Sequence, residues 1–323
     1  MRVLGPCQMF SNDLDVSDRV NTTDPQKVNQ EINRIFLDLY PASTTNALDR
    51  AFSDLDRIYR GEVPGFHACD TAYHDIQHVL DVTLAMARLI DGYERSRVGT
   101  DPLGKDLYQL GVITALFHDV GYIRRESETQ AKNGAEFTLI HVSRGAQFLK
   151  DYLPSLGMPE MADIAADLVH FTGYERPVSS IRVPGLTYRL LGNLLGSADI
   201  IAQMADRCYL EKCRDRLYPE FVTGGIATKK NAEGKIEVIF SSGEDLLRKT
   251  PGFYAGATRR LKEDLDNGLD YAETHFGGQN LYVEGAEKNM RFAEMVRDGQ
   301  DFSLLKRTPP ETLFVEAAAE KEK

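Results

Sequence analysis

The sequence has few cysteines and no long apolar run, and each absence excludes a class of protein. No apolar stretch approaches the roughly 18 to 20 residues that span a bilayer, and the N-terminus lacks the apolar core of a secretory signal. We therefore expect a cytoplasmic protein. The cysteines form no CxxC pair and are too sparse for a disulfide framework, so free thiols are expected at Cys7, Cys69, Cys208 and Cys213.

The chain also lacks an excess of basic residues, and its formal net charge is -11. A protein that binds nucleic acid polymers generally carries a basic surface, so this class of partner is disfavoured, as is a membrane. A small anionic substrate remains compatible with the charge, because one metal centre and a few local cations can override the global field.

The composition is that of a globular protein, with 42% hydrophobic and 27% charged residues. Residues 1–25 are polar and aperiodic, which predicts a mobile or loosely docked N-terminal arm. Residues 26–300 form one helical domain, with its core at about 45–280. Residues 303–323 are charged and contain proline, which is typical of a tail.

Helical spacing of apolar residues recurs along the domain. The predicted helices cover about 28–40, 47–61, 75–92, 105–119, 129–153, 159–171, 186–205, 207–221, 243–276 and 283–297. Without strands to make a sheet, these helices must bury one another's apolar stripes, which predicts an all-α bundle. The exception is a small hairpin near 228–241. The segment 222–250 could cover a site as a lid or form a homodimer contact, and both interpretations stay open.

Six of the seven histidines lie between residues 67 and 170. In the segment TAYHDIQHVLDVTLAMARLI, His74 and His78 are four residues apart, so a helix would carry both on one face. His78 is followed by an apolar stripe at helical spacing, which puts it on or beside the buried face. A buried imidazole needs a polar partner.

Two carboxylates lie in equally apolar surroundings. His118 and Asp119 end the apolar run LYQLGVITALFHDVGY, and Asp199 lies within LLGNLLGSADIIAQMA. A buried carboxylate costs several kcal/mol unless it is paired or coordinated. One divalent cation, with neutral imidazoles completing its shell, would satisfy both carboxylates.

This ordered set of a histidine, a His-Asp doublet and a distant aspartate resembles the HD superfamily of metal-dependent phosphohydrolases, which are helical bundles around a buried metal centre. The element YHDIQH is similar to the opening motif of class I cyclic-nucleotide phosphodiesterases. The resemblance implies that one metal is held by His78, His118, Asp119 and Asp199.

The resemblance also implies catalytic roles and a second metal. His74 matches the histidine that protonates the leaving oxygen, and Asp119 would bridge two metals. His141 and His170 match the extra ligands of dinuclear members. The doublet is followed by Tyr122 and Ile123, without the third histidine or the GYP motif of the nucleotide-specific branches, so cyclic-nucleotide specificity does not transfer.

The resemblance therefore implies hydrolysis of a small anionic phosphate ester by a hydroxide activated by divalent ions, with two ions expected from among Mn, Fe, Zn and Mg. Arg124, Arg125 and Lys132 follow the doublet and could hold the phosphate. Two alternatives stay open: an HD-fold di-iron oxygenase acting on a small polyol or phosphonate, and a non-catalytic HD module that binds a nucleotide.

Overall fold

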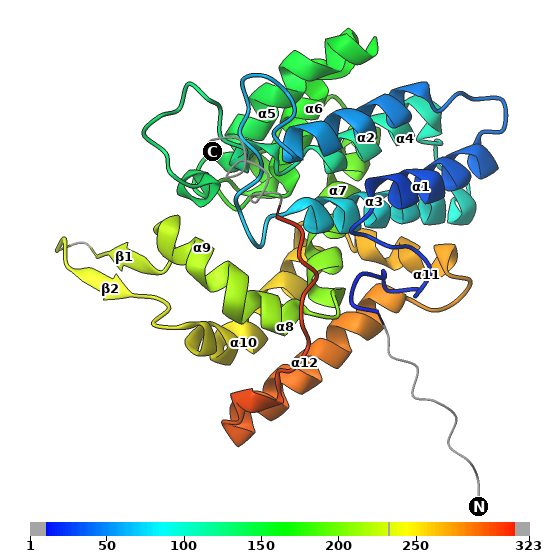
Figure 1. Ribbon diagram of the computed structural model, residues 1–323. Helices are drawn as coiled ribbons and strands as arrows, with labels where there is room; N and C mark the ends of the chain where they lie inside the picture. The colour runs from blue at the N-terminus through cyan, green and yellow to red at the C-terminus, as the bar shows by residue number, and fades with distance from the viewer. Residues whose placement is uncertain (1–10, 232, 314–323) are drawn as a thin grey trace, which may run out of the picture.

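The computed structural model describes residues 11–231 and 233–313, and these residues are predominantly helical (Figure 1). The first half of the chain contains α1 (Pro25–Leu39), α2 (Asn46–Tyr59), α3 (Ile76–Ser96), α4 (Gly104–Leu116), α5 (His141–Tyr152), α6 (Ala162–Leu168) and α7 (Leu186–Ala205). The second half contains α8 (Tyr209–Lys212), a π-helix (Cys213–Leu217), α9 (Tyr218–Thr223), α10 (Gly243–Glu263), α11 (Tyr271–His275) and α12 (Leu281–Gly299). The prediction of an all-α fold is confirmed for the described residues.

Helix α3 lies at the centre of the bundle and packs against α1, α4, α7 and α11 (Figure 1). Helices α4 and α7 are apolar on most of their surface, and the residues from Leu110 to Leu116 are all buried. A helix that is apolar all round must be covered on every side. The core therefore surrounds the carboxyl end of α4, where the His-Asp doublet follows.

Several predicted helices are shorter or more interrupted than expected; the one predicted over 159–171, for example, is α-helical only at Ala162–Leu168. The helix predicted over 129–153 begins at His141, because Asn133 and Glu136 form a capping box on a separate 3₁₀ turn at Gly134–Phe137. The helix predicted over 243–276 is interrupted after Glu263, where Asp266 and Asn267 adopt left-handed backbone conformations that no α-helix contains.

The predicted hairpin is confirmed. Strand β1 (Thr228–Lys230) pairs antiparallel with β2 (Ile236–Val238), and all six strand residues are exposed. The hairpin projects beside α9 and α10 (Figure 1). A two-stranded hairpin is marginally stable alone, so its contacts with the rest of the chain, described below, matter for its position.

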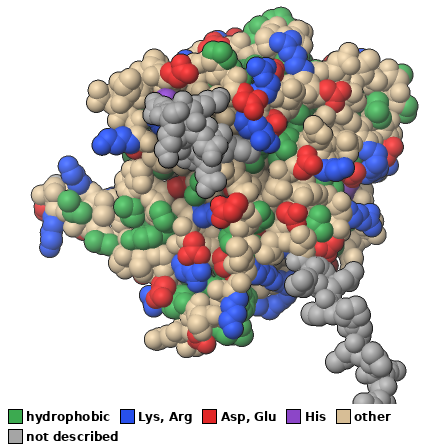
Figure 2. Space-filling view, in the orientation of Figure 1, with side chains coloured by type: hydrophobic (Ala, Val, Ile, Leu, Met, Phe, Trp, Pro, Cys, Tyr) green, Lys and Arg blue, Asp and Glu red, His purple; other side chains and the backbone are tan. Residues whose placement is uncertain are grey.

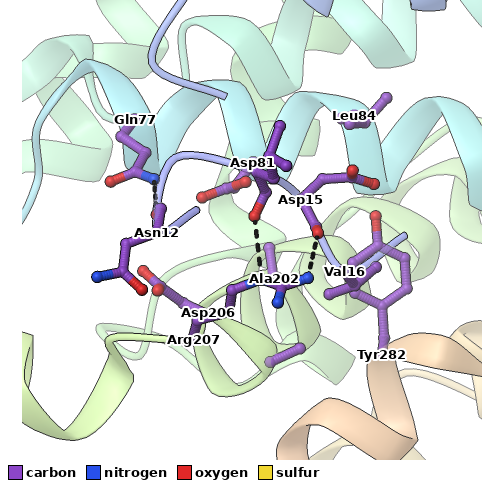
Figure 3. A pocket seen from close by; sticks show the side chains of 12 residues that line it. Asn12, Asp15, Val16, Gln77, Asp81, Leu84, Ala202, Asp206, Arg207 and Tyr282 are labelled. Carbon is purple, nitrogen blue, oxygen red and sulfur yellow. Dashed lines mark hydrogen bonds between the residues drawn. The ribbon is translucent and has the colours of Figure 1, made fainter. Parts of the chain in front are cut away.

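The prediction of a loose N-terminal arm is wrong for residues 11–24. Asp15 is buried and accepts a hydrogen bond of 2.5 Å from the equally buried Arg88 of α3, which also donates to Tyr282. Arg207 donates to the backbone oxygen of Asp15. Figure 3 shows the small pocket that Asp15, Arg207 and Tyr282 line together. The segment is docked because a buried guanidinium requires a carboxylate partner. Residues 1–10 of the predicted arm lie outside the described residues.

Part of the predicted tail also contacts the domain. Leu305 and Thr312 are buried, and the Thr312 hydroxyl donates to Asp75 at the start of α3. Arg216 donates to the Pro310 carbonyl at 2.6 Å. Residues 303–313 therefore pack across the chain, and residues 314–323 lie outside the described part.

Two expectations from composition can be compared with the structure. Cys69, Cys208 and Cys213 are free thiols, as predicted, and Cys7 lies outside the described residues. None of the helices within 11–231 and 233–313 combines the length and the apolar character needed to cross a bilayer.

Candidate metal centre

The His-Asp doublet lies in the turn between α4 and a 3₁₀ helix at Val120–Tyr122. His118 Nδ1 donates a hydrogen bond of 2.7 Å to the carbonyl oxygen of Ala115. A carbonyl can only accept, so Nδ1 carries the proton and Nε2 is the nitrogen that can act as a ligand. This backbone bond is the usual means of orienting a metal-binding histidine.

Three buried residues converge at this point. His78, His118 and Asp119 offer ligand atoms that all lie within 4.8 Å of one another. Asp119 Oδ2 lies 3.3 Å from His78 Nε2 and 3.2 Å from His118 Nε2. Within the described part of the chain, His118 Nε2 and Asp119 Oδ2 are buried without a hydrogen-bond partner. Unsatisfied buried groups of this kind are costly, and a bound cation would satisfy both, so this group could hold a metal ion.

Asp199, on α7, faces the same point. Its Oδ1 lies 3.5 Å from His78 Nε2 and 3.8 Å from His118 Nε2. The structure thus brings together the four residues that the sequence predicted for one metal. Two imidazoles and two carboxylates form a mixed donor set that suits several divalent ions.

His141 lies beside the second oxygen of Asp119. Its Nδ1 donates to the Thr138 carbonyl at 2.7 Å, and its Nε2 lies 3.6 Å from Asp119 Oδ1. A glycine permits this approach: a Cβ at Gly121 would lie 1.9 Å from the His141 carbonyl oxygen. The chain thereby allows the start of α5 to pack directly on the doublet turn.

His170, predicted as a ligand of the second metal, contacts other side chains in this structure. Its Nδ1 donates to Glu175 at 2.7 Å, and Arg176 donates to its Nε2 at 2.6 Å. Both ring nitrogens are therefore engaged by protein groups. Of the residues predicted for the second metal, the structure places His141 beside Asp119.

The charges within the group are strongly coupled. Burial would raise the pKa of Asp119, but the adjacent His118 and His78 rings lower it well below its usual value. Burial would lower the pKa of His118, but Asp119 and Asp199 raise it to about 9. The carboxylates thus attract positive charge to this point, and a metal ion entering it would displace the proton from His118 Nε2 while Nδ1 keeps its own.

His74 lies next to this group but precedes α3, because Asp75 caps the helix and α3 begins at Ile76. The prediction that His74 and His78 share one helical face is therefore wrong, although their rings are 5.7 Å apart. His74 Nδ1 donates to Glu220 Oε2 at 2.5 Å, and its ring stacks on Tyr122. Burial would lower the pKa of His74, but Glu220 raises it.

Glu220 is a functional candidate that the sequence reasoning missed. It is buried and also accepts a hydrogen bond of 2.5 Å from the Tyr73 backbone. It lies 146 positions from His74 in the chain. The one available signal was an acidic residue within the apolar-flanked segment RLYPEFV.

The predicted phosphate-binding residues lie elsewhere. Arg124 donates to Asp70 at 2.7 Å, the Arg125 guanidinium lies over the Phe66 ring, and Lys132 is exposed. None of the three is among the described residues that line the cavity at the His-Asp group. Their proximity to the doublet in the sequence was misleading because the chain turns away after Tyr122.

A cavity of about 970 Å³ opens onto the group. His74, His78, Asp119, His141 and Asp199 line it. Among the described lining residues, Lys249 of α10 carries a positively charged side chain, and its Nζ donates to Asp245 at 3.0 Å. The segment 222–250 contributes to the wall, including residues 238–240 of the hairpin. The volume is at the upper end of the range for small-molecule sites.

Comparison of the chain with protein-family models, with curated proteins and with solved structures finds no match.

Proposed function

We propose that this chain is a metal-dependent phosphohydrolase of the HD superfamily that hydrolyses a small phosphate monoester or diester. The observation that carries the proposal is the buried meeting of His78, His118, Asp119 and Asp199, with ligand atoms of two of them left unsatisfied among the described residues. A divalent ion held there, such as Mn, Fe, Zn or Mg, would supply Lewis acidity towards phosphoryl oxygens and lower the pKa of a water molecule.

The residues around the group have separate tasks in this proposal. Asp119 and Asp199 provide negative charge that holds the cation. His74 lines the cavity, and its raised pKa keeps a proton available near neutral pH. With Nδ1 committed to Glu220, Nε2 is the atom that donates a proton to the leaving oxygen.

The proposal is tested first by elemental analysis of anaerobically purified protein. We expect bound divalent metal in the wild type and in His170→Ala, because the His170 ring is engaged by Glu175 and Arg176. Asp199→Asn is expected to weaken metal binding by at least about tenfold, the loss typical of perturbing even an outer partner of a metal. Failure of the wild type to bind any divalent ion would favour a non-catalytic nucleotide-binding module.

The second test measures, with the same preparation, the hydrolysis of phosphate monoesters and diesters and the consumption of O₂. We expect phosphate release without O₂ consumption, and a loss of about 10² to 10⁴ in kcat for His74→Ala with its metal retained. Substrate-dependent O₂ uptake by the iron-loaded protein would instead support the oxygenase. That alternative draws less support here, since His170 of the second metal site is otherwise engaged.

A further inference from the structure

The cavity at the His-Asp group has walls of two chemical kinds. Polar and titratable side chains come from α3, α7 and the segments around the doublet. The wall formed by the π-helix, α9, the hairpin and α10 is mainly apolar. The apolar side chains of this wall are Leu217, Phe221, Ile226, Val238, Ile239, Phe240, Leu246 and Phe253.

This apolar wall is built into the fold. Phe221 and Phe240 pack with their ring centroids 5.7 Å apart. Both contact a second hydrophobic cluster that contains Leu246 and is separate from the main core. The backbone amides of Ile226 and Ala227 donate to the Phe221 carbonyl, which ties the base of the hairpin to α9, and the amides of Ile239 and Phe240 donate to the Ala227 carbonyl across the hairpin. The wall is thus formed by ordered side chains.

Apolar side chains are also exposed where they line the cavity. The exposed fractions are 68% for Leu139, 64% for Tyr174, 62% for Val238 and 42% for Phe253. Figure 2 shows hydrophobic side chains along the hairpin and on the surface next to it. Single exposed apolar residues are ordinary, but a group of them around one cavity is typical of a binding site.

Side-chain amides, which can both donate to and accept from a nucleobase edge, are scarce in the described lining. Gln203 contributes an amide side chain to the lining, but its Oε1 already accepts a hydrogen bond from the Tyr73 hydroxyl. Lys249 donates to the Ile239 carbonyl and to Asp245. Recognition of a base requires free donors and acceptors, whereas this wall offers mainly apolar contact area.

We propose, building on the phosphohydrolase function above, that the substrate is an amphiphile: a phosphate ester whose leaving group is a long-chain or polycyclic alcohol. The phosphate head lies at the His-Asp group and the apolar part lies against the hairpin, α9 and α10. Hydrolysis breaks the bond between phosphorus and the leaving oxygen, and a water oxygen bonds to phosphorus. His74 supplies a proton to the leaving oxygen, so the products are inorganic phosphate, for a monoester, and an apolar alcohol.

The test is a series of n-alkyl phosphates from methyl to dodecyl, each kept below its micelle concentration, with the metal-loaded full-length protein. Burial of one methylene favours transfer from water by up to about fourfold. We expect kcat/KM to rise by at least about tenfold between the butyl and octyl esters. A flat series, with methyl phosphate turned over as well as octyl phosphate, overturns the amphiphile while leaving the phosphohydrolase intact.

Two variants on the same strand locate the binding surface. Val238 lines the cavity and Ile236 does not, although each is 62% exposed on β2. Val238→Ser is expected to lower kcat/KM for octyl phosphate by about threefold to tenfold and to leave methyl phosphate nearly unchanged. Ile236→Ser is the matched control and is expected to behave as wild type. Equal effects of the two substitutions on octyl phosphate turnover would show that the octyl group does not bind against Val238.

Calorimetric binding of n-octylphosphonate, which is not hydrolysed, separates the two proposals. We expect it to bind the metal-loaded protein more tightly than either methylphosphonate or 1-octanol, and Val238→Ser to weaken it. If this pattern is found but no phosphate ester is hydrolysed, the ligand class stands and the phosphohydrolase proposal fails. If methylphosphonate binds as tightly as octylphosphonate, the amphiphile is refuted whatever the turnover.

Discussion

Glu220→Gln tests how the chain controls the proton on His74. Glu220 Oε2 accepts from His74 Nδ1 at 2.5 Å, and its other oxygen accepts from the Tyr73 backbone. Glutamine has the same shape and keeps one of the two acceptors, but it removes the negative charge and turns an NH₂ group towards either His74 Nδ1 or the Tyr73 amide. The substitution therefore changes the electrostatics around His74 with little change in packing.

The size of the effect follows from the bond that is altered. A hydrogen bond to a charged group contributes about 1.5 to 3 kcal/mol, and 1.36 kcal/mol corresponds to one pKa unit. Loss of the Glu220 charge should therefore lower the pKa of His74. A general acid must be protonated, so the alkaline limb of kcat should move to lower pH.

The assay is kcat for a phosphate ester between pH 5 and 10, with metal content measured at each end. The matched control is Asp91→Asn, which removes a buried carboxylate 2.7 Å from His275 Nδ1, and neither residue lines the cavity as described. The control should leave the limb in place. An unshifted limb in Glu220→Gln, with metal and fold retained, would refute the assignment of His74 as the acid.

Three further predictions concern the docked N-terminal segment and the discarded phosphate site. Asp15→Asn leaves the buried guanidinium of Arg88 without its counter-charge, and chemical denaturation should show a loss of about 3 to 5 kcal/mol in the free energy of unfolding. In the wild type, burial opposes ionisation of Asp15, but Arg88 and neighbouring hydrogen bonds lower its pKa from 3.8 to about 2. Because the pKa of Asp15 is lower in the folded state than in the unfolded state, the ionised carboxylate adds about 2 kcal/mol to the free energy of unfolding above about pH 4, and this contribution is lost as the pH falls towards 2. The free energy of unfolding, measured between pH 5 and 2, should fall by this amount in the wild type but not in Asp15→Asn. Arg124→Ala should change KM for a phosphate ester by less than about twofold while reducing stability, since Arg124 is bound to Asp70; a large rise in KM would restore its predicted role.

The residues that meet at the candidate metal centre could be predicted because each is anomalous in its local segment. His78 begins the apolar stripe of α3, the His118-Asp119 doublet ends an all-apolar helix, and Asp199 interrupts another. A charge in such a place needs a partner wherever the rest of the chain lies. The hairpin was predictable for a similarly local reason, because β-branched residues follow a turn-forming segment.

His170 shows the limit of that reasoning. It is buried in an apolar segment, just as those residues are, but its partners in the structure are Glu175 and Arg176, five and six residues further along the chain. A buried histidine requires hydrogen-bonding partners, and an apolar context does not distinguish a metal from a carboxylate and an arginine. Arg124 failed for the complementary reason, because Asp70 binds it from a distant loop.

The sequence alone was sufficient to determine the helical class, the hairpin and the polar residues that must be neutralised in the core, because periodicity and the cost of burying charge act over a few residues. Only the tertiary structure decided which of these residues meet. It brought Glu220 to His74, engaged the His170 ring away from the group, and formed the apolar wall from the π-helix, α9, the hairpin and α10. The Glu220 contact joins residues 146 positions apart, which no local pattern records, whereas the partners of His170 are close in the chain but an apolar context could not distinguish them from a metal.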